Sequence, residues 1–117
     1  MKKKAFRAML GLFEMNGIPI AYYSYPENHA PDLPYAVYYF PGERPDPADD
    51  NHWTGIRELN IELYTREKDF MIEYSVDEIL RSYELIYTKV ETYLNDEHMY
   101  QVLYQTEVTI WDESDTD

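Results

Sequence analysis

The chain has 117 residues, a formal net charge of −13 and no cysteine. Its length predicts one domain large enough to bury a core, and the lack of cysteine excludes disulfides and thiolate metal sites. Its excess of carboxylates disfavours nucleic-acid partners, and it shows neither the pattern of a signal peptide nor an apolar run close to the roughly 20 residues of a membrane span.

A first amphipathic helix is expected over residues 2–16. Its apolar residues recur at helical spacing, at Phe6, Met9, Leu10 and Phe13. Asn16 and Gly17 then supply residue types that tolerate the left-handed backbone of a helix C-cap. The start of this helix carries a basic cluster, formed by Lys2, Lys3, Lys4 and Arg7. We interpret this cluster as a solubilising helix start rather than a DNA site, because the rest of the chain is strongly acidic.

Three strands are expected next. A short strand begins at Ile18 and ends near Pro26, a loop follows over residues 27–34, and residues 35–40 form an aromatic strand whose two faces are both apolar enough to be covered. Residues 41–56 are expected to be a long exposed loop, because prolines and carboxylates interrupt any regular pattern.

The third strand, residues 57–64, alternates apolar and polar residues. The alternation points three apolar side chains inward, those of Leu59, Ile61 and Leu63. It points three polar side chains outward, those of Glu58, Asn60 and Glu62.

A second helix is expected over residues 69–83, where apolar residues again follow a helical repeat: Ile72, Val76, Ile79, Leu80 and Tyr83. The same repeat places three carboxylates on the opposite side of this helix: Glu73, Asp77 and Glu78. A final hairpin is expected from residues 87–93 and 100–111, and its second strand alternates almost throughout. Residues 112–117 form an acidic tail that we expect to be disordered.

The expected order is therefore α-β-β-β-α-β-β, in a single domain over residues 1–111. Hairpin-connected strands interspersed with helices favour the α+β class. In this class we expect a mostly antiparallel sheet of four to five strands, with two helices packed on one face.

Motifs that carry chemistry are missing from the sequence. It contains no glycine-rich phosphate loop, no nucleophile elbow and no metalloprotease signature. Its three histidines, His29, His52 and His98, fall in separate predicted loops, which disfavours a shared metal site. The carboxylates of the loop at 41–56 lack the spacing of a calcium loop. We therefore expect no enzyme activity, no metal and no cofactor.

Tyrosine is unusually frequent, with 13 residues, and it is enriched at protein interfaces as well as in ordinary sheets. Our candidates for a protein interface are five aromatic residues: Trp53, Tyr38, Tyr39, Phe40 and Tyr64. Trp53 ends an otherwise polar loop, so it either covers the edge of the sheet or becomes buried against a neighbouring subunit on assembly.

Three segments carry a resemblance to a known family: residues 33–41 (LPYAVYYFP), 59–69 (LNIELYTREKD) and 91–104 (ETYLNDEHMYQVLY). Over roughly residues 18–110 the chain resembles the small head-tail joining and tail completion proteins of siphophages and Gram-positive prophages. The resemblance implies a tail terminator, a virion protein that forms a ring, typically a hexamer, on the end of the tail tube. Such a ring stops tube polymerisation and offers the surface on which the filled head docks.

The resemblance also implies the partners, which are further copies of the chain, the tail tube protein and a head-completion or connector protein. It brings no catalytic residues, and it places the protein in the virion at the head-tail interface, and in the host cytoplasm during assembly. Two other classes stay open. One is a monomeric adaptor that binds a peptide through a sheet edge. The other is a small enzyme whose loop residues would form a deep pocket with perturbed titratable groups.

Overall fold

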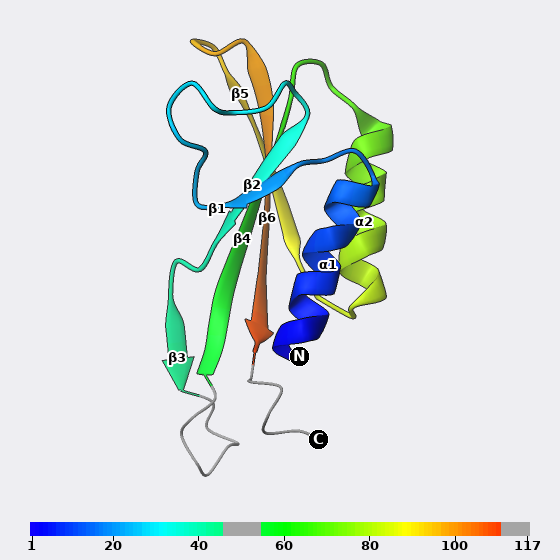
Figure 1. Ribbon diagram of the computed structural model, residues 1–117, viewed down its shortest axis with the longest axis vertical. Helices are drawn as coiled ribbons and strands as arrows, with labels where there is room; N and C mark the ends of the chain where they lie inside the picture. Colours follow the sequence, from blue (N-terminus) through cyan, green and yellow to red (C-terminus); the bar gives the residue numbers. More distant parts are fainter. Residues whose placement is uncertain (46–54, 111–117) are drawn as a thin grey trace.

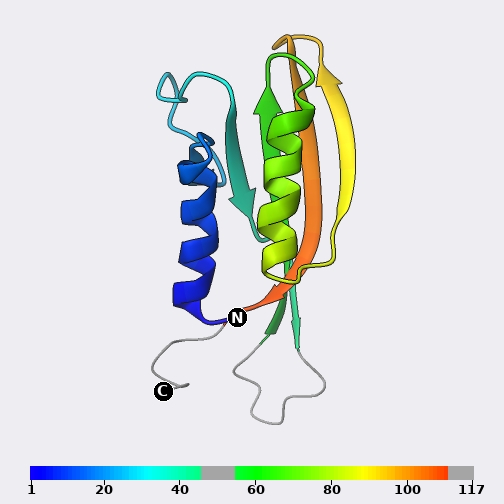
Figure 2. The ribbon, with the colours of Figure 1, turned by 90° about the vertical axis from the view of Figure 1, so that its right-hand side faces the viewer.

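A computed structural model of the protein describes residues 1–45 and 55–110. In chain order its elements are α1 (Lys3–Met15), β1 (Ile20–Tyr22), β2 (Tyr35–Tyr39), β3 (Glu43–Pro45), β4 (Gly55–Thr65), α2 (Phe70–Ser82), β5 (Thr88–Leu94) and β6 (Met99–Thr109). The six strands form one sheet in the order β1-β2-β4-β6-β5, and β3 pairs with β4 beside β2. Both helices lie on the same side of this sheet (Figures 1 and 2).

The predicted α+β class and the two helices on one face are confirmed. The sheet is larger than predicted, with six strands instead of four to five, and it is mixed because β1 runs parallel to β2. The parallel pair follows from the connection over residues 23–34, which is long enough to return the chain to the end of the sheet where β1 began. The remaining strand pairs are antiparallel, and the longest joins β4 to β6 from Ile56–Thr109 to Thr65–Tyr100.

The prediction of a loop over residues 41–56 is wrong in part, because Glu43–Pro45 forms the strand β3, which pairs with residues 55–57 of β4. Proline is tolerated in an edge strand, where its missing N–H interrupts no ladder. Two ion pairs help to hold this edge: Arg57 Nε to Glu43 Oε1 at 2.9 Å, and Arg44 to Glu107 at 3.3 Å. The rest of that loop, residues 46–54, and the predicted tail at 112–117 lie outside the described residues.

The core lies between the two helices and the sheet face that they cover. The inward side chains of β4 are fully buried, as the alternation predicts, and so is Tyr104 of β6. From the helices the core receives Phe6, Met9 and Phe13 of α1, and Val76, Ile79 and Leu80 of α2. Burying such side chains supplies about 1.5–3 kcal/mol each, which is the main source of stability.

The charged side of α2 differs from the prediction. Glu78 is exposed as expected, but Glu73 is only 6% exposed and lies between α2 and β5. Its carboxylate pairs with Lys68 Nζ at 2.5 Å and with Lys89 Nζ at 3.4 Å. Asp77 is also partly buried, and it accepts a hydrogen bond of 2.8 Å from the hydroxyl of Tyr87. Helical periodicity could not show this, because the two lysines come from outside the helix.

Candidate interaction site

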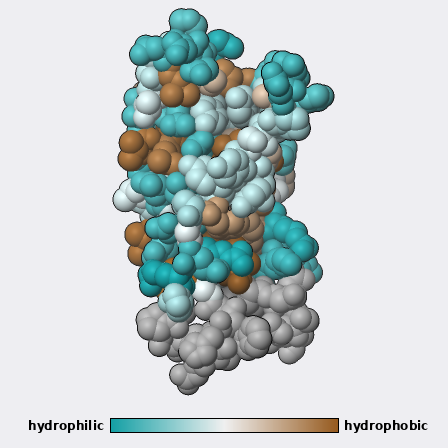
Figure 3. Space-filling model, turned by 90° about the vertical axis from the view of Figure 1, so that its left-hand side faces the viewer, coloured by the Kyte–Doolittle hydropathy of each residue, from teal (hydrophilic) through white to brown (hydrophobic). Residues whose placement is uncertain are grey.

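The sheet has a second face, which we call the open face, on the side away from the helices. Strand alternation and register bring its side chains together in rows: Val37 of β2 lies opposite Glu62 of β4, Glu62 opposite Leu103 of β6, and Leu103 opposite Val90 of β5. The connection over residues 23–34 extends from the sheet on this side (Figure 1). Figure 3 shows this side of the molecule as mainly hydrophilic, with separate apolar areas.

A hydrogen-bond network centred on Glu62 lies on the open face, over β2, β4 and β6. Both carboxylate oxygens of Glu62 accept phenolic hydrogen bonds, from Tyr64 at 2.5 Å and from Tyr39 at 2.7 Å. Gln101 Nε2 donates to the Tyr64 hydroxyl at 3.0 Å, and Asn60 Nδ2 donates to the Tyr39 hydroxyl at 3.4 Å. We call these five residues the Glu62 network. It fixes the two tyrosine rings, so they could contact a partner with little loss of side-chain entropy.

Other tyrosines extend this ordered surface. Tyr35 lies between Tyr25 and Tyr64, with ring centroids 5.3 Å apart in each pair. Tyr23 packs against Tyr39 at 5.4 Å. These are the distances of edge-to-face and tilted aromatic pairs. The open face therefore carries a continuous row of tyrosines from the β1–β2 connection to β4.

Two phenol groups of the sheet, those of Tyr64 and Tyr104, resist ionisation. Burial raises the pKa of Tyr64, and its hydrogen bond to the Glu62 carboxylate raises it further. On the helix side, burial raises the pKa of Tyr104, and the charges of Asp77 and Glu73 add to this effect. Both tyrosines therefore stay protonated in the folded protein at pH values where an ordinary phenol, with a pKa of about 10, ionises.

We expect alkaline pH to destabilise the protein through these groups. Below pH 10 their contribution to stability is complete. Above pH 10 the unfolded chain loses phenolic protons that the folded chain keeps. The buried phenol of Tyr104 alone then lowers the free energy of unfolding by about 1.4 kcal/mol for each pH unit. This loss continues until the pH reaches the pKa of Tyr104 in the folded protein. Phenolate absorbance and circular dichroism followed together should show ionisation coinciding with unfolding.

Tyr104→Phe is the matched control for this prediction, because it keeps the ring and removes the proton. It should unfold at higher pH than the wild-type protein. If all tyrosines ionise near pH 10 while the secondary structure persists, the phenols are not protected and the prediction is wrong.

The structure divides the predicted interface residues between the two faces of the sheet. Tyr39 and Tyr64 lie on the open face, joined through Glu62. Tyr38 and Phe40 lie on the helix side, where each packs against Phe6 with ring centroids 5.7 and 5.8 Å apart. Trp53 lies outside the described residues. The alternation of the strand therefore places residues that are neighbours in the sequence on opposite faces of the sheet.

Sequence reasoning missed several exposed apolar side chains. Phe70, Met71 and Tyr74, on the outer side of the first turns of α2, are 73%, 79% and 58% exposed. Ile86, before β5, is 92% exposed. The sequence does contain a pattern that indicates the exposure of Phe70 and Tyr74. They lie four residues apart, so they share one side of the helix, and they fall outside the apolar repeat that faces the core.

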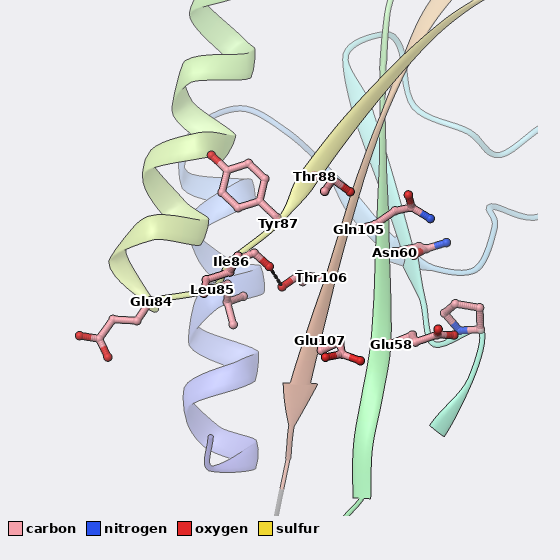
Figure 4. A pocket seen from close by; sticks show the side chains of 11 residues that line it. Glu58, Asn60, Glu84, Leu85, Ile86, Tyr87, Thr88, Gln105, Thr106 and Glu107 are labelled. Carbon is pink, nitrogen blue, oxygen red and sulfur yellow. Dashed lines mark hydrogen bonds between the residues drawn. The ribbon is translucent and has the colours of Figure 1, made fainter. Parts of the chain in front are cut away.

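A groove of about 800 Å³ lies at the lower part of the open face (Figure 4). Its floor is formed by outward residues of β4 and β6, including Glu58, Asn60, Gln105 and Glu107. One wall is formed by residues 84–88, which belong to the α2–β5 connection and the first position of β5. A hydrogen bond of 2.6 Å from Thr106 Oγ1 to the carbonyl of Ile86 holds this wall. The groove thus combines carboxylates with exposed apolar atoms.

Within residues 1–45 and 55–110 no three His, Asp or Glu side chains are grouped closely enough to hold a metal ion. In the same part of the chain, neither helix has the length and hydropathy that crossing a membrane requires.

The elements define a two-layer α+β fold in which both helices cover one face of a mixed sheet. No protein-family model matches the chain, and no curated protein matches its sequence significantly. Among solved structures, the fold is similar to that of a chain in the virion of the native gene transfer agent (GTA) particle. The TM-score is 0.51 at 12% sequence identity, and the match covers 91% of this chain and 90% of that chain. At this identity the likeness concerns the fold.

Proposed function

We propose that this protein is a structural subunit of a phage-type virion and acts as a tail terminator, a ring at the head-tail junction that caps the tail tube and docks the head. The observation that carries the proposal is the fold shared with a chain of the GTA virion over 91% of this chain and 90% of the other. This likeness supports a virion subunit, and the more specific role of a tail terminator rests on the sequence resemblance of residues 18–110 to tail completion proteins.

The surface of the molecule fits such a role physically. A ring requires contacts between two different surfaces of neighbouring copies. The protein offers the free edge of β5, the row of tyrosines on the open face and the exposed apolar turn of α2 for such contacts. Its net charge of −13 would keep DNA from adhering to a channel that it lines. In this role the partners are further copies, the tube protein and a connector protein, and the protein needs no cofactor and performs no catalysis.

Self-association is the first expected result. Light scattering over a concentration series should show a closed oligomer of fixed size, such as a hexamer, formed either by the protein alone or after tube protein is added. A protein that stays monomeric under both conditions would contradict the ring.

Trp53→Ala tests the proposal at the loop between β3 and β4. If Trp53 is an assembly anchor, the substitution should leave the melting temperature nearly unchanged and weaken association by roughly 2 kcal/mol, as truncation of a central interface residue does. Thermal unfolding and sedimentation measured on the same sample separate the two effects. A large drop in melting temperature would show instead that Trp53 belongs to the core of the subunit.

The alternative function is a monomeric adaptor that binds a peptide by adding a strand to the sheet. It is favoured by β5, an edge strand in which six of seven residues are exposed, from Thr88 to Tyr93. An adaptor would remain monomeric with tube protein present and would bind an extended peptide at this edge. The oligomeric state therefore distinguishes the two functions.

A further inference from the structure

Three exposed cations lie together at the start of α1. Five of the ten Lys and Arg residues form ion pairs with nearby carboxylates: Arg44 with Glu107, Arg57 with Glu43, Lys68 with Glu73, Arg81 with Glu78 and Lys89 with Asp77. Lys3, Lys4 and Arg7 are exposed, and no ion pair forms at any of them within residues 1–45 and 55–110. We call these three residues the basic end.

Among residues 1–45 and 55–110, the positive charge of the basic end is not compensated locally. The first turn of α1 contains no acidic residue, and its N-cap, Lys2, makes no capping hydrogen bond through its side chain. A helix N-terminus already carries a partial positive charge, so cations placed there raise the local potential further. In a chain of net charge −13, this end is a site of opposite sign that an acidic surface would stabilise.

The groove of the open face provides an acidic surface of this kind. Glu58 and Glu107 line it together, whereas the carboxylate of the third lining glutamate, Glu84, points away from them (Figure 4). The described residues that line the groove include no Lys or Arg. Glu58 lies directly opposite Glu107 in the register of β4 and β6, and like charges in this position repel each other. Arg44 approaches Glu107 at 3.3 Å, and no ion pair is formed by Glu58 in the described part of the chain. An additional cation would therefore relieve the repulsion.

The two surfaces cannot meet within one subunit. The basic end belongs to the layer of helices, whereas Glu58 and Glu107 point from the opposite face of the sheet (Figures 1 and 4). The sheet separates them, so contact requires two copies. A contact between two different surfaces is heterologous, and repetition of such a contact closes a ring when the rotation between copies allows it.

Building on the ring role proposed above, we propose that the basic end of α1 in one copy docks into the acidic groove of the next copy. Lys3, Lys4 and Arg7 would approach Glu58 and Glu107, and exposed Ile86 at the wall would supply apolar contact. The occupant of the groove is thus a second copy of this chain. The contact is electrostatic at its centre, so association should weaken as ionic strength rises.

A charge exchange between two full-length variants tests this contact. The groove variant carries Glu58→Lys and Glu107→Lys, and the helix variant carries Lys3→Glu, Lys4→Glu and Arg7→Glu. Each variant alone should associate more than about 100-fold less tightly than the wild-type protein, because like charges would then face each other. Mixed together they should associate again, since every contact pairs a basic with an acidic surface.

Circular dichroism melts must first show that both variants are folded. Arg81→Glu, at an exposed pair on α2 outside the groove, is the matched control and should leave association unchanged. If the wild-type protein associates and the reversals have no effect, or if the folded variants do not recover on mixing, the inference is wrong while the ring role stands. A wild-type protein that never associates overturns both.

The acidic residues after β6 are a rival partner for the basic end. Neutralising them in the full chain, with Asp112→Asn, Glu113→Gln, Asp115→Asn and Asp117→Asn, should leave the salt-sensitive association in place. Loss of association in this variant would assign the basic end to those residues and overturn the docking of neighbouring copies.

Discussion

Ile61→Asp is expected to unfold the domain. Ile61 is fully buried in β4, and in the register of the sheet it lies between Tyr38 of β2 and Tyr104 of β6. An aspartate there would bury a carboxylate in the hydrophobic core, away from the water that stabilises its charge. The cost of several kcal/mol is comparable with the whole stability of a domain of this size, which is about 5–15 kcal/mol.

Two matched substitutions identify the cause. Ile61→Val keeps the position apolar and should cost about 1 kcal/mol. Asn60→Asp adds the same charge one residue away on the open face, where water can reach it, and should leave the protein folded. Denaturant unfolding of the three variants measures these differences. A folded and cooperative Ile61→Asp protein would mean that β4 does not place this residue in the core.

The second large effect is expected at Glu73. The double variant Lys68→Met and Lys89→Met removes both cations that pair with this carboxylate, whose side chain is 7% exposed. An unpaired buried carboxylate is costly, so we expect the free energy of unfolding to fall by about 3 kcal/mol. Urea unfolding at constant pH and salt measures this loss.

Adding Glu73→Leu to the double variant should restore most of the stability, because a buried ion pair can be replaced by apolar side chains at little cost. Arg81→Met removes an exposed pair with Glu78 and should change stability by less than about 1 kcal/mol. If the double variant is as stable as Arg81→Met, water compensates Glu73 and the buried network contributes little.

Most of the fold was predictable because two long strands and two helices have unambiguous periods. Alternation in β4 assigned Leu59 and Ile61 to the core and Glu62 to the other face, as the structure has them. The strand β3 was missed because three residues beside prolines have no period to read. The burial of Glu73 was missed because its partners come from other elements, and a helical repeat describes only the helix itself.

The candidate site was less predictable than the fold. Composition drew attention to the tyrosines, but only the register of β2 and β4 joined Tyr39 and Tyr64 through Glu62 and moved Tyr38 to the helix side. The groove depends on the approach of the α2–β5 connection to β4 and β6, three segments distant in sequence. Such convergence is a property of tertiary structure and leaves no local pattern.

The role as a tail terminator is tested most directly by electron microscopy of the purified protein mixed with polymerising tail tube protein. We predict rings seated on tube ends and tubes that stop growing, with unfolded Ile61→Asp protein as the inactive control. Tubes of unchanged length with uncapped ends, in the presence of an excess of folded protein, would contradict the proposed role.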